Sequence, residues 1–385
     1  MLAACVGHYR VANILLKEGA DVSVARSNDG VTALHCSAVE GHVAVTKLLV
    51  EAGADLEGRT SRVPPLCLAA TEGKVYAMEV LIEAGANPNS RSFDGSTPLY
   101  AAACKGHVDA IKVLLRAKAN PLLSQLSPSS GLTFVPLDGA AQYGHWEVVY
   151  ELIQERGIEG CGGDSGGLLA LCLAAANGHV AAMEVLTSTG VVDTGGEALH
   201  DAAMCGRESS VKFLLLQRTR NSSSGERAAY VNIPDSYGTT PTVFSIMACR
   251  PCSPRITRML VDAGADTTTA ARLSDGGGAV YFGDTPLAYT NYLIREKKIR
   301  GGIATESQLN SLEATRRLLM RVEAAHAVSW LWAAGATSVA HSCTKAPSSS
   351  EVTPTPLTLM LPVLRRRAAR PRVLLAALFR HSVKP

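Results

Sequence analysis

The stretch TPLYAAACKGHVDAIKVLLRAKAN, residues 97–120, decides the fold. Thr97 belongs to the residue types that cap helix N-termini, and Pro98 suits the first helical position, where its missing N–H costs nothing. Gly106 is expected to end this first helix in a left-handed conformation. Apolar residues recur at helical spacing on both sides of that glycine: Leu99, Ala102, Ala103, Val108, Ile111, Leu114 and Leu115. The stretch therefore predicts two short helices joined by a tight turn.

The same pattern recurs along more than half of the chain, at residues 32–55, 64–87, 135–157, 169–190 and 197–217. One leucine anchors each copy: Leu34, Leu66, Leu99, Leu137, Leu171 and Leu199. Successive anchors are 32, 33, 38, 34 and 28 residues apart, and a glycine follows each anchor by seven residues. A unit of about 33 residues cannot bury its own apolar face, so neighbouring units must stack into a solenoid.

The motifs T-P-L-H, A-A, G-H, L-L and G-A-D of these copies closely resemble the ankyrin repeat over residues 2–217. The resemblance implies an all-α ankyrin-repeat solenoid, in which helix-turn-helix units alternate with β-hairpin fingers. Asp29-Gly30 and Asp94-Gly95 are turn pairs that suit the tips of such fingers. The resemblance also implies binding of a partner protein through the finger tips and the concave face formed by the first helices.

The repeat pattern divides the chain into four parts. Residues 1–217 are predicted to form a half repeat, which lacks a preceding finger, and six repeats. We expect a polar insertion loop over 218–234, and divergent repeats with a long C-terminal capping helix over 235–332. Residues 333–385 are rich in Ser, Thr, Pro and Arg, a composition that favours disorder.

Two short motifs look like those of chymotrypsin-like serine proteases: TALHC at 32–36, with His35, and GDSGG at 163–167, with Ser165. The repeat phase places these two residues four repeats apart along the stack. A nucleophile and its base need about 2.6–3.2 Å between them. The sequence therefore predicts no catalytic residues, and the chain is expected not to be an enzyme.

Cofactor and metal sites are not expected either. Five histidines each follow a repeat glycine, once per repeat, so they cannot converge on one ion: His8, His42, His107, His145 and His179. Cys249 and Cys252 form one Cys-x-x-Cys pair without a second pair nearby. The glycines of 160–167 lack the Lys-Ser/Thr of a phosphate loop.

Four arginines make a candidate binding row for an acidic segment of a partner. Arg26 and Arg91 lie at the same repeat phase, two fingers apart, and Arg59 and Arg62 belong to the finger between them. The guanidinium group binds carboxylates in a fork geometry. Further candidates come from the exposed side of the first helices and the start of one of them: Tyr100, Lys105, Gln142, Tyr143 and Asn177. Leu48 and Leu114 are expected in the core.

The charge of the chain is divided unevenly. Residues 333–385 hold eight Lys or Arg and one acid, a charge of +7, whereas residues 1–332 hold 29 basic and 33 acidic residues, a charge of −4. The segment RRRAARPR, 365–372, is open to three interpretations: a nuclear import signal, a nucleic-acid arm or solubilising charge. Of these three interpretations, the nucleic-acid arm is the least favoured.

The sequence thus predicts an intracellular scaffold or adaptor that binds another protein and no small-molecule substrate. No apolar run reaches the roughly 18–20 residues of a membrane helix, and no secretory signal begins the sequence. The expected location is the cytoplasm, with the nucleus as the alternative. The alternative function is a regulatory or inhibitory subunit of an enzyme, or a nuclear regulator that uses the basic tail.

Overall fold

The computed structural model describes most of the chain: residues 1–126, 133–221, 224–235, 238–248, 250–268, 271–274, 280–300 and 306–342. The chain forms two compact units. One comprises Met1–Asp266 with Ala271–Phe282, and the other comprises Thr267–Ala270 with Gly283–Pro385. In the described part of the chain, no helix has the length and apolar character needed to cross a membrane.

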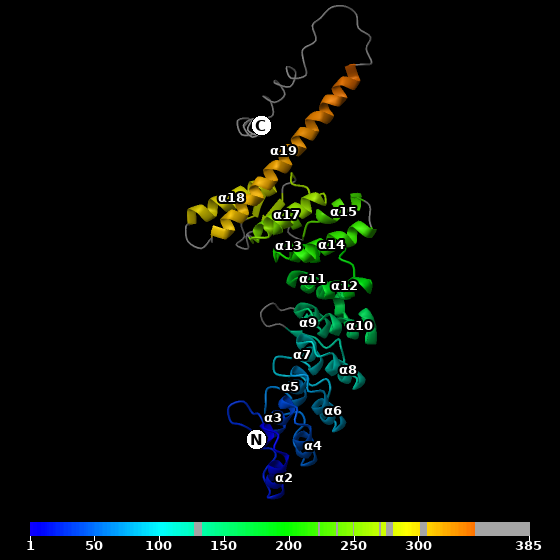
Figure 1. Cartoon of the computed structure of the whole chain (residues 1–385), viewed down its shortest axis with the longest axis vertical. Helices are drawn as coiled ribbons and strands as arrows, with labels where there is room; N and C mark the ends of the chain where they lie inside the picture. Colours follow the sequence, from blue (N-terminus) through cyan, green and yellow to red (C-terminus); the bar gives the residue numbers. More distant parts are fainter. Residues whose placement is uncertain are drawn as a thin grey trace, which may run out of the picture. The chain divides into compact units, whose positions relative to one another are not determined.

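The first unit is a stack of helix pairs (Figure 1). The pairs are α1 (Leu2–Cys5) and α2 (Tyr9–Lys17), α3 (Ala33–Glu40) and α4 (Val43–Glu51), α5 (Pro65–Thr71) and α6 (Val75–Glu83), α7 (Pro98–Lys105) and α8 (Val108–Arg116), α9 (Pro136–Tyr143) and α10 (Trp146–Cys161), α11 (Leu168–Asn177) and α12 (Val180–Ser188), α13 (Glu197–Met204) and α14 (Glu208–Asn221), and α16 (Pro241–Met247) and α17 (Ser253–Asp262). First helices pack on first helices in chain order, and second helices on second helices. The predicted all-α solenoid of stacked helix pairs is confirmed.

The helix ends carry the capping residues that the repeat sequence predicts. Thr97 caps α7 by accepting a hydrogen bond from the Tyr100 N–H through Oγ1, at 3.2 Å, and Pro98 opens the helix. Gly106 ends α7 with φ +78°, in the left-handed region that glycine enters without a Cβ clash. Lys118 holds a φ of +64° where the neighbouring repeats have glycine, so a side chain is tolerated there at some backbone cost.

A second reason for glycine is the next repeat. A Cβ at Gly106 would lie 2.5 Å from Nδ1 of His145, because that imidazole stacks on the end of α7. Nε2 of His145 then donates to the Cys104 carbonyl at 3.1 Å. A hydrogen bond of the same kind, to a backbone carbonyl of the preceding repeat, joins His42 to Cys5 at 3.0 Å and His107 to Thr71 at 2.9 Å. The guanidinium of Arg207 takes the place of the imidazole and donates to the Ala176 carbonyl at 2.9 Å. Four junctions between neighbouring repeats are therefore tied by this bond.

The core consists mainly of small and aliphatic side chains. Ala102 and Ala103 on α7 are fully buried, which allows the neighbouring first helices to approach closely. Leu114 on α8 is fully buried as predicted. The prediction for Leu48 was wrong: it is only partly buried, and Leu49 takes the core position on α4. The register of the repeat accounts for this difference. Leu49 follows its anchor Leu34 by 15 residues, as Leu114 follows Leu99, so Leu49 and not Leu48 is the equivalent of Leu114.

The fingers between the helix pairs contain less strand than expected. In the described residues, paired strands occur in β1 (Gln125–Leu126) with β2 (Thr133–Phe134), which are antiparallel, and in β3 (Ala271–Ser274) with β4 (Val280–Asp284). Other fingers close through single backbone bonds, as from the Arg26 N–H to the Val31 carbonyl at 2.8 Å. Gly30 adopts a φ of +71° in that turn, as its turn pair predicted.

The polar loop predicted over 218–234 is incorrect. α14 continues to Asn221, and α15 spans Ser224–Val231. Tyr230 and Val231 are buried, and the Tyr230 hydroxyl donates to Asp193 Oδ2 at 2.6 Å. These side chains give the insertion an apolar face, so it folds onto the neighbouring repeat despite its polar beginning.

The second unit contains α18 (Pro286–Arg300) and α19 (Glu306–Ser342), which pack against each other. Leu312 and Leu319 of α19 are buried. The helix runs ten residues past the predicted end at Trp332, because the alanine-rich start of the predicted tail favours a helix. That this helix caps the repeats stays a prediction. Residues 343–385 and Cys249 lie outside the described part.

Replacing Leu114 with alanine is expected to destabilise the protein by roughly 2–5 kcal/mol, because it leaves a cavity in a fully buried site. Leu48→Ala is the matched control and should cost less than half as much, since part of that side chain already meets solvent. Chemical denaturation followed by circular dichroism measures both. Equal losses for the two variants would mean that the helix faces are assigned incorrectly.

Candidate partner-binding surface

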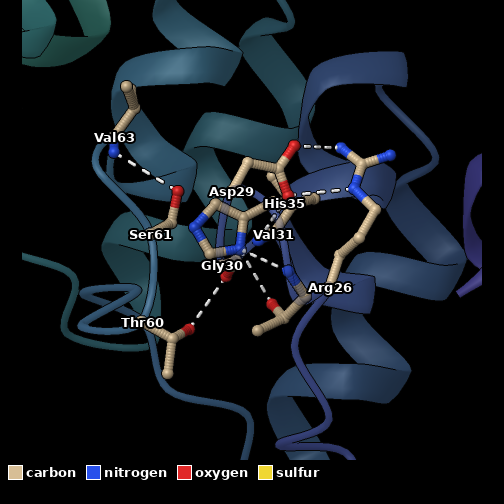
Figure 2. A network of polar contacts seen from close by, with 9 residues as sticks. Arg26, Asp29, Gly30, Val31, His35, Thr60, Ser61 and Val63 are labelled. Carbon is tan, nitrogen blue, oxygen red and sulfur yellow. Dashed lines mark hydrogen bonds and ion pairs between the residues drawn. The ribbon is translucent and has the colours of Figure 1, made fainter.

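Arg26, the first member of the arginine row, is already paired inside its own finger. Its Nε donates to Asp29 Oδ1 at 2.9 Å, and Nη2 lies 2.5 Å from Oδ2, a bidentate ion pair (Figure 2). Hydrogen bonding from Arg26 lowers the pKa of Asp29, so the carboxylate is charged at neutral pH. This finger therefore presents a largely neutralised guanidinium group.

The first and second fingers are joined by hydrogen bonds near the same place. Figure 2 shows Thr60, whose Oγ1 donates to the Gly30 carbonyl at 2.9 Å. In the same region, Nδ1 of the buried His35 accepts from the Thr32 N–H at 3.1 Å. Burial lowers the pKa of His35, so this imidazole is neutral at physiological pH. The T-P-L-H histidine of this repeat is therefore structural.

Arg91, in the third finger, also has structural partners. Its Nη1 donates to the Gly95 carbonyl at 3.2 Å and to the Ser124 carbonyl, in the following repeat, at 2.9 Å. Of the predicted row, Arg26 and Arg91 thus make structural contacts, Arg26 within its own finger and Arg91 also to the following repeat. Arg59 and Arg62 remain, both exposed and neither of them in an ion pair among the described residues.

Arg62 lies against the aromatic side chain of Phe93, which is not among the predicted candidates. The guanidinium carbon of Arg62 is 5.1 Å from the centre of the Phe93 ring, and the Phe93 N–H donates to the Arg62 carbonyl at 2.8 Å. The Phe93 side chain is 81% exposed. The sequence feature that could have indicated Phe93 is its aromatic side chain, at a finger position where other repeats have Asn28, Thr60 and Ser165.

The candidates on the first helices differ in accessibility. Lys105 and Tyr143 are exposed at the ends of α7 and α9. Gln142 and Asn177 are half-buried, and Asn177 Nδ2 donates to the Leu173 carbonyl of its own helix at 2.9 Å. Tyr100 is half-buried beside Cys104, and burial raises the pKa of both side chains, that of Cys104 to about 11. Of these first-helix candidates, Lys105 and Tyr143 are exposed and accessible to a partner protein.

The structure does not bring the protease-like residues together. His35 lies on α3, and Ser165 lies in the short turn η1 (Gly163–Ser165) before α11. The helices α5, α7 and α9 separate α3 from α11 in the stack. Ser165 Oγ donates to the Gly162 carbonyl at 3.2 Å. Across the described residues, no three His, Cys, Asp or Glu side chains gather as a metal site.

A stack of helix pairs with short fingers defines a repeat solenoid. The family model for ankyrin repeats matches this chain in three copies, over residues 1–92, 59–125 and 137–224. The chain belongs to the ankyrin repeat family. Ankyrin repeats are generally protein–protein interaction modules, and the family is generally non-catalytic.

Asp138 takes the place of the T-P-L-H histidine in the fourth repeat. Its Oδ2 accepts from the Val135 N–H at 2.9 Å, and its side chain is buried with Oδ1 unpartnered. Burial raises the pKa of Asp138 to about 7 from an ordinary value of 3.8. Because the folded-state pKa lies above the unfolded one, the contribution of this group is complete below about pH 4. It is lost as the pH rises through 7.

Asp138→Asn should therefore stabilise the protein at neutral and alkaline pH, because the amide oxygen can accept the same bond without a charge. Its advantage over the wild type is expected to grow by about 2 kcal/mol between pH 5 and pH 8 and to level off above that. Urea denaturation at a series of pH values measures this difference. A difference that does not change with pH would show that Asp138 is not buried as a neutral acid.

Proposed function

We propose that this chain is a non-catalytic scaffold or adaptor that binds a protein segment through its second and third fingers. The observation that carries the proposal is the exposed ring of Phe93, with the guanidinium of Arg62 stacked on it. Arginine is enriched among the residues that dominate binding energy at protein interfaces, and phenylalanine is enriched at such interfaces relative to the rest of the surface. An exposed aromatic side chain on a finger has no role in the repeat core.

The geometry supports a preformed binding site. Backbone hydrogen bonding between Phe93 and Arg62 fixes the two tips relative to each other, so less conformational freedom is lost on binding. Arg59 and Arg62 add two positive charges that have no ion-pair partner within the described part of the chain, which favours an acidic segment. Lys105 and Tyr143 extend the surface along the first helices.

An intracellular location agrees with the state of the thiols. The eight cysteines of the described residues are all free, as expected for a protein kept in a reducing compartment. We propose the cytoplasm as the working location, and the nucleus as the alternative because of the basic segment 365–372.

The double variant Arg62→Glu/Phe93→Ala tests this function. Partners captured by the full chain are identified by mass spectrometry, and the Kd of each purified partner is then measured. We expect at least a tenfold weakening, because both the aromatic anchor and its cation are lost. Tyr76→Ala is the control, since Tyr76 is 73% exposed on a second helix, away from the fingers. Unchanged affinity in the double variant would contradict the proposed site.

A further inference from the structure

Two free thiols line one cavity at the junction of the first two repeats. Cys5 of α1 is partly exposed, and Cys36 of α3 is buried, with 8% of its surface exposed. The cavity has a volume of about 240 Å³, and Arg26, Val39 and Leu68 also contribute to its wall. It gives a small solute an approach to both sulfurs.

The repeat register directs these two positions toward each other. Cys5 stands two residues before the glycine of its repeat, and Cys36 stands five residues before the glycine of the next. Cys104 and Gly139 hold the same two positions at the junction of α7 with α9. There, Sγ of Cys104 lies 2.6 Å from the place that a Cβ on Gly139 would take. The register therefore brings a sulfur on the earlier helix against the Cβ of the later one.

A hydrogen bond holds the backbone at Cys5 in this register. His42 Nε2 donates to the Cys5 carbonyl at 3.0 Å, as His145 Nε2 does to the Cys104 carbonyl at 3.1 Å. Burial, followed by the hydrogen bond and the charge of the Cys5 thiol, raises the pKa of the Cys36 thiol to about 12. The two thiols are thus close enough to act on each other.

The repeat fold does not require cysteine at either position. At the later junctions the same two positions hold Val39 and Leu68, Thr71 and Ala101, Cys104 and Gly139, Gln142 and Leu173, and Ala176 and Asp201. A single cysteine often serves as a small apolar residue of a core. Among these junctions, however, the first has a thiol on both sides, and one of the two thiols is partly exposed.

We propose that Cys5 and Cys36 are a modification site for a low-molecular-weight disulfide, which oxidises the pair to a bond between α1 and α3. Cys5, the more exposed thiol, loses its proton to solvent and attacks one sulfur of the oxidant. The S–S bond of the oxidant breaks, and the first thiolate leaves and takes a proton from solvent. Cys36 then attacks the Cys5 sulfur, and its proton goes to the second departing thiolate. Two protein thiols are oxidised, and one disulfide is reduced to two thiols.

The surroundings of Cys36 favour the second step once the first has occurred. The positive charge of Arg26 lowers the pKa of the Cys36 thiol, in opposition to burial. Reaction of Cys5 removes the hydrogen bond and the charge through which its thiol raises that pKa. Cys36 therefore becomes more acidic when its thiolate is needed. In a reducing compartment the bond would form transiently, as redox-sensing disulfides do.

Peptide mapping of the oxidised full chain tests the proposal. Trypsin places Cys5 in the peptide 1–10 and Cys36 in the peptide 27–47, and neither peptide holds another cysteine. The chain is incubated with glutathione disulfide, and its remaining thiols are then blocked with N-ethylmaleimide in denaturant. Mass spectrometry should find these two peptides linked, and dithiothreitol should separate them. Glutathione retained on Cys5 while Cys36 carries the blocking group would overturn the proposal.

Alanine variants separate the two steps. Cys36→Ala should retain about tenfold more glutathione on Cys5 than the wild type does, because the thiol that displaces it is missing. Cys5→Ala should leave Cys36 without glutathione, since Cys36 is buried. Cys104→Ala is the matched control, because Gly139 stands opposite Cys104, and it should not change the yield of linked peptides. The map of the wild type needs no variant and stays decisive if a variant does not fold.

Hydrogen exchange supplies the second measurement. The new bond closes the loop from residue 5 to residue 36, so exchange over α1 should slow by about tenfold in the oxidised chain. Exchange over α7 should stay the same, because no new bond reaches that helix. Linked peptides without slower exchange over α1, or a link from Cys5 to a cysteine other than Cys36, would contradict the assigned site.

Discussion

The repeat array depends on one contact, made between the glycine that ends a first helix and the side chain that begins the next repeat's second helix. At Gly106 the imidazole of His145 occupies the space that a Cβ would need, and its Nε2 holds the Cys104 carbonyl. The glycine is therefore required twice, for its positive φ and for this close approach. Lys74 and Arg207 stack in the same way on Gly41 and Gly178, so the position is more constant than the residue.

This contact separates the residues that build the fold from those that can vary. The buried alanines and leucines, the helix caps and the backward hydrogen bonds account for nearly every regular position of the repeat. Even polar residues that look functional are used for structure, as the pairing of Arg26 with Asp29 and the carbonyl contacts of Arg91 show. A small set of exposed residues is not needed for the repeat fold, among them Phe93 on a finger and Trp146 on α10.

The fold could be predicted from the sequence because the period, the caps and the glycines are local features. The prediction failed where a contact distant in sequence decides. The polar start of 218–234 gave no sign that Tyr230 would bond to Asp193. The candidate surface was predictable in type and only partly in detail. The finger phase located Arg62, but only the folded chain places Phe93 against it.

The most direct test of this account compares two glycine-to-alanine substitutions with nearly the same backbone geometry. Gly106 and Gly53 have φ values of +78° and +82°, but a Cβ at Gly53 would meet nothing within 4 Å. Gly53→Ala should cost only the backbone term, about 1–2 kcal/mol. Gly106→Ala should cost at least about 1 kcal/mol more in chemical denaturation, because the His145 contact must move. Equal losses for the two variants would contradict the claim that this contact couples the repeats.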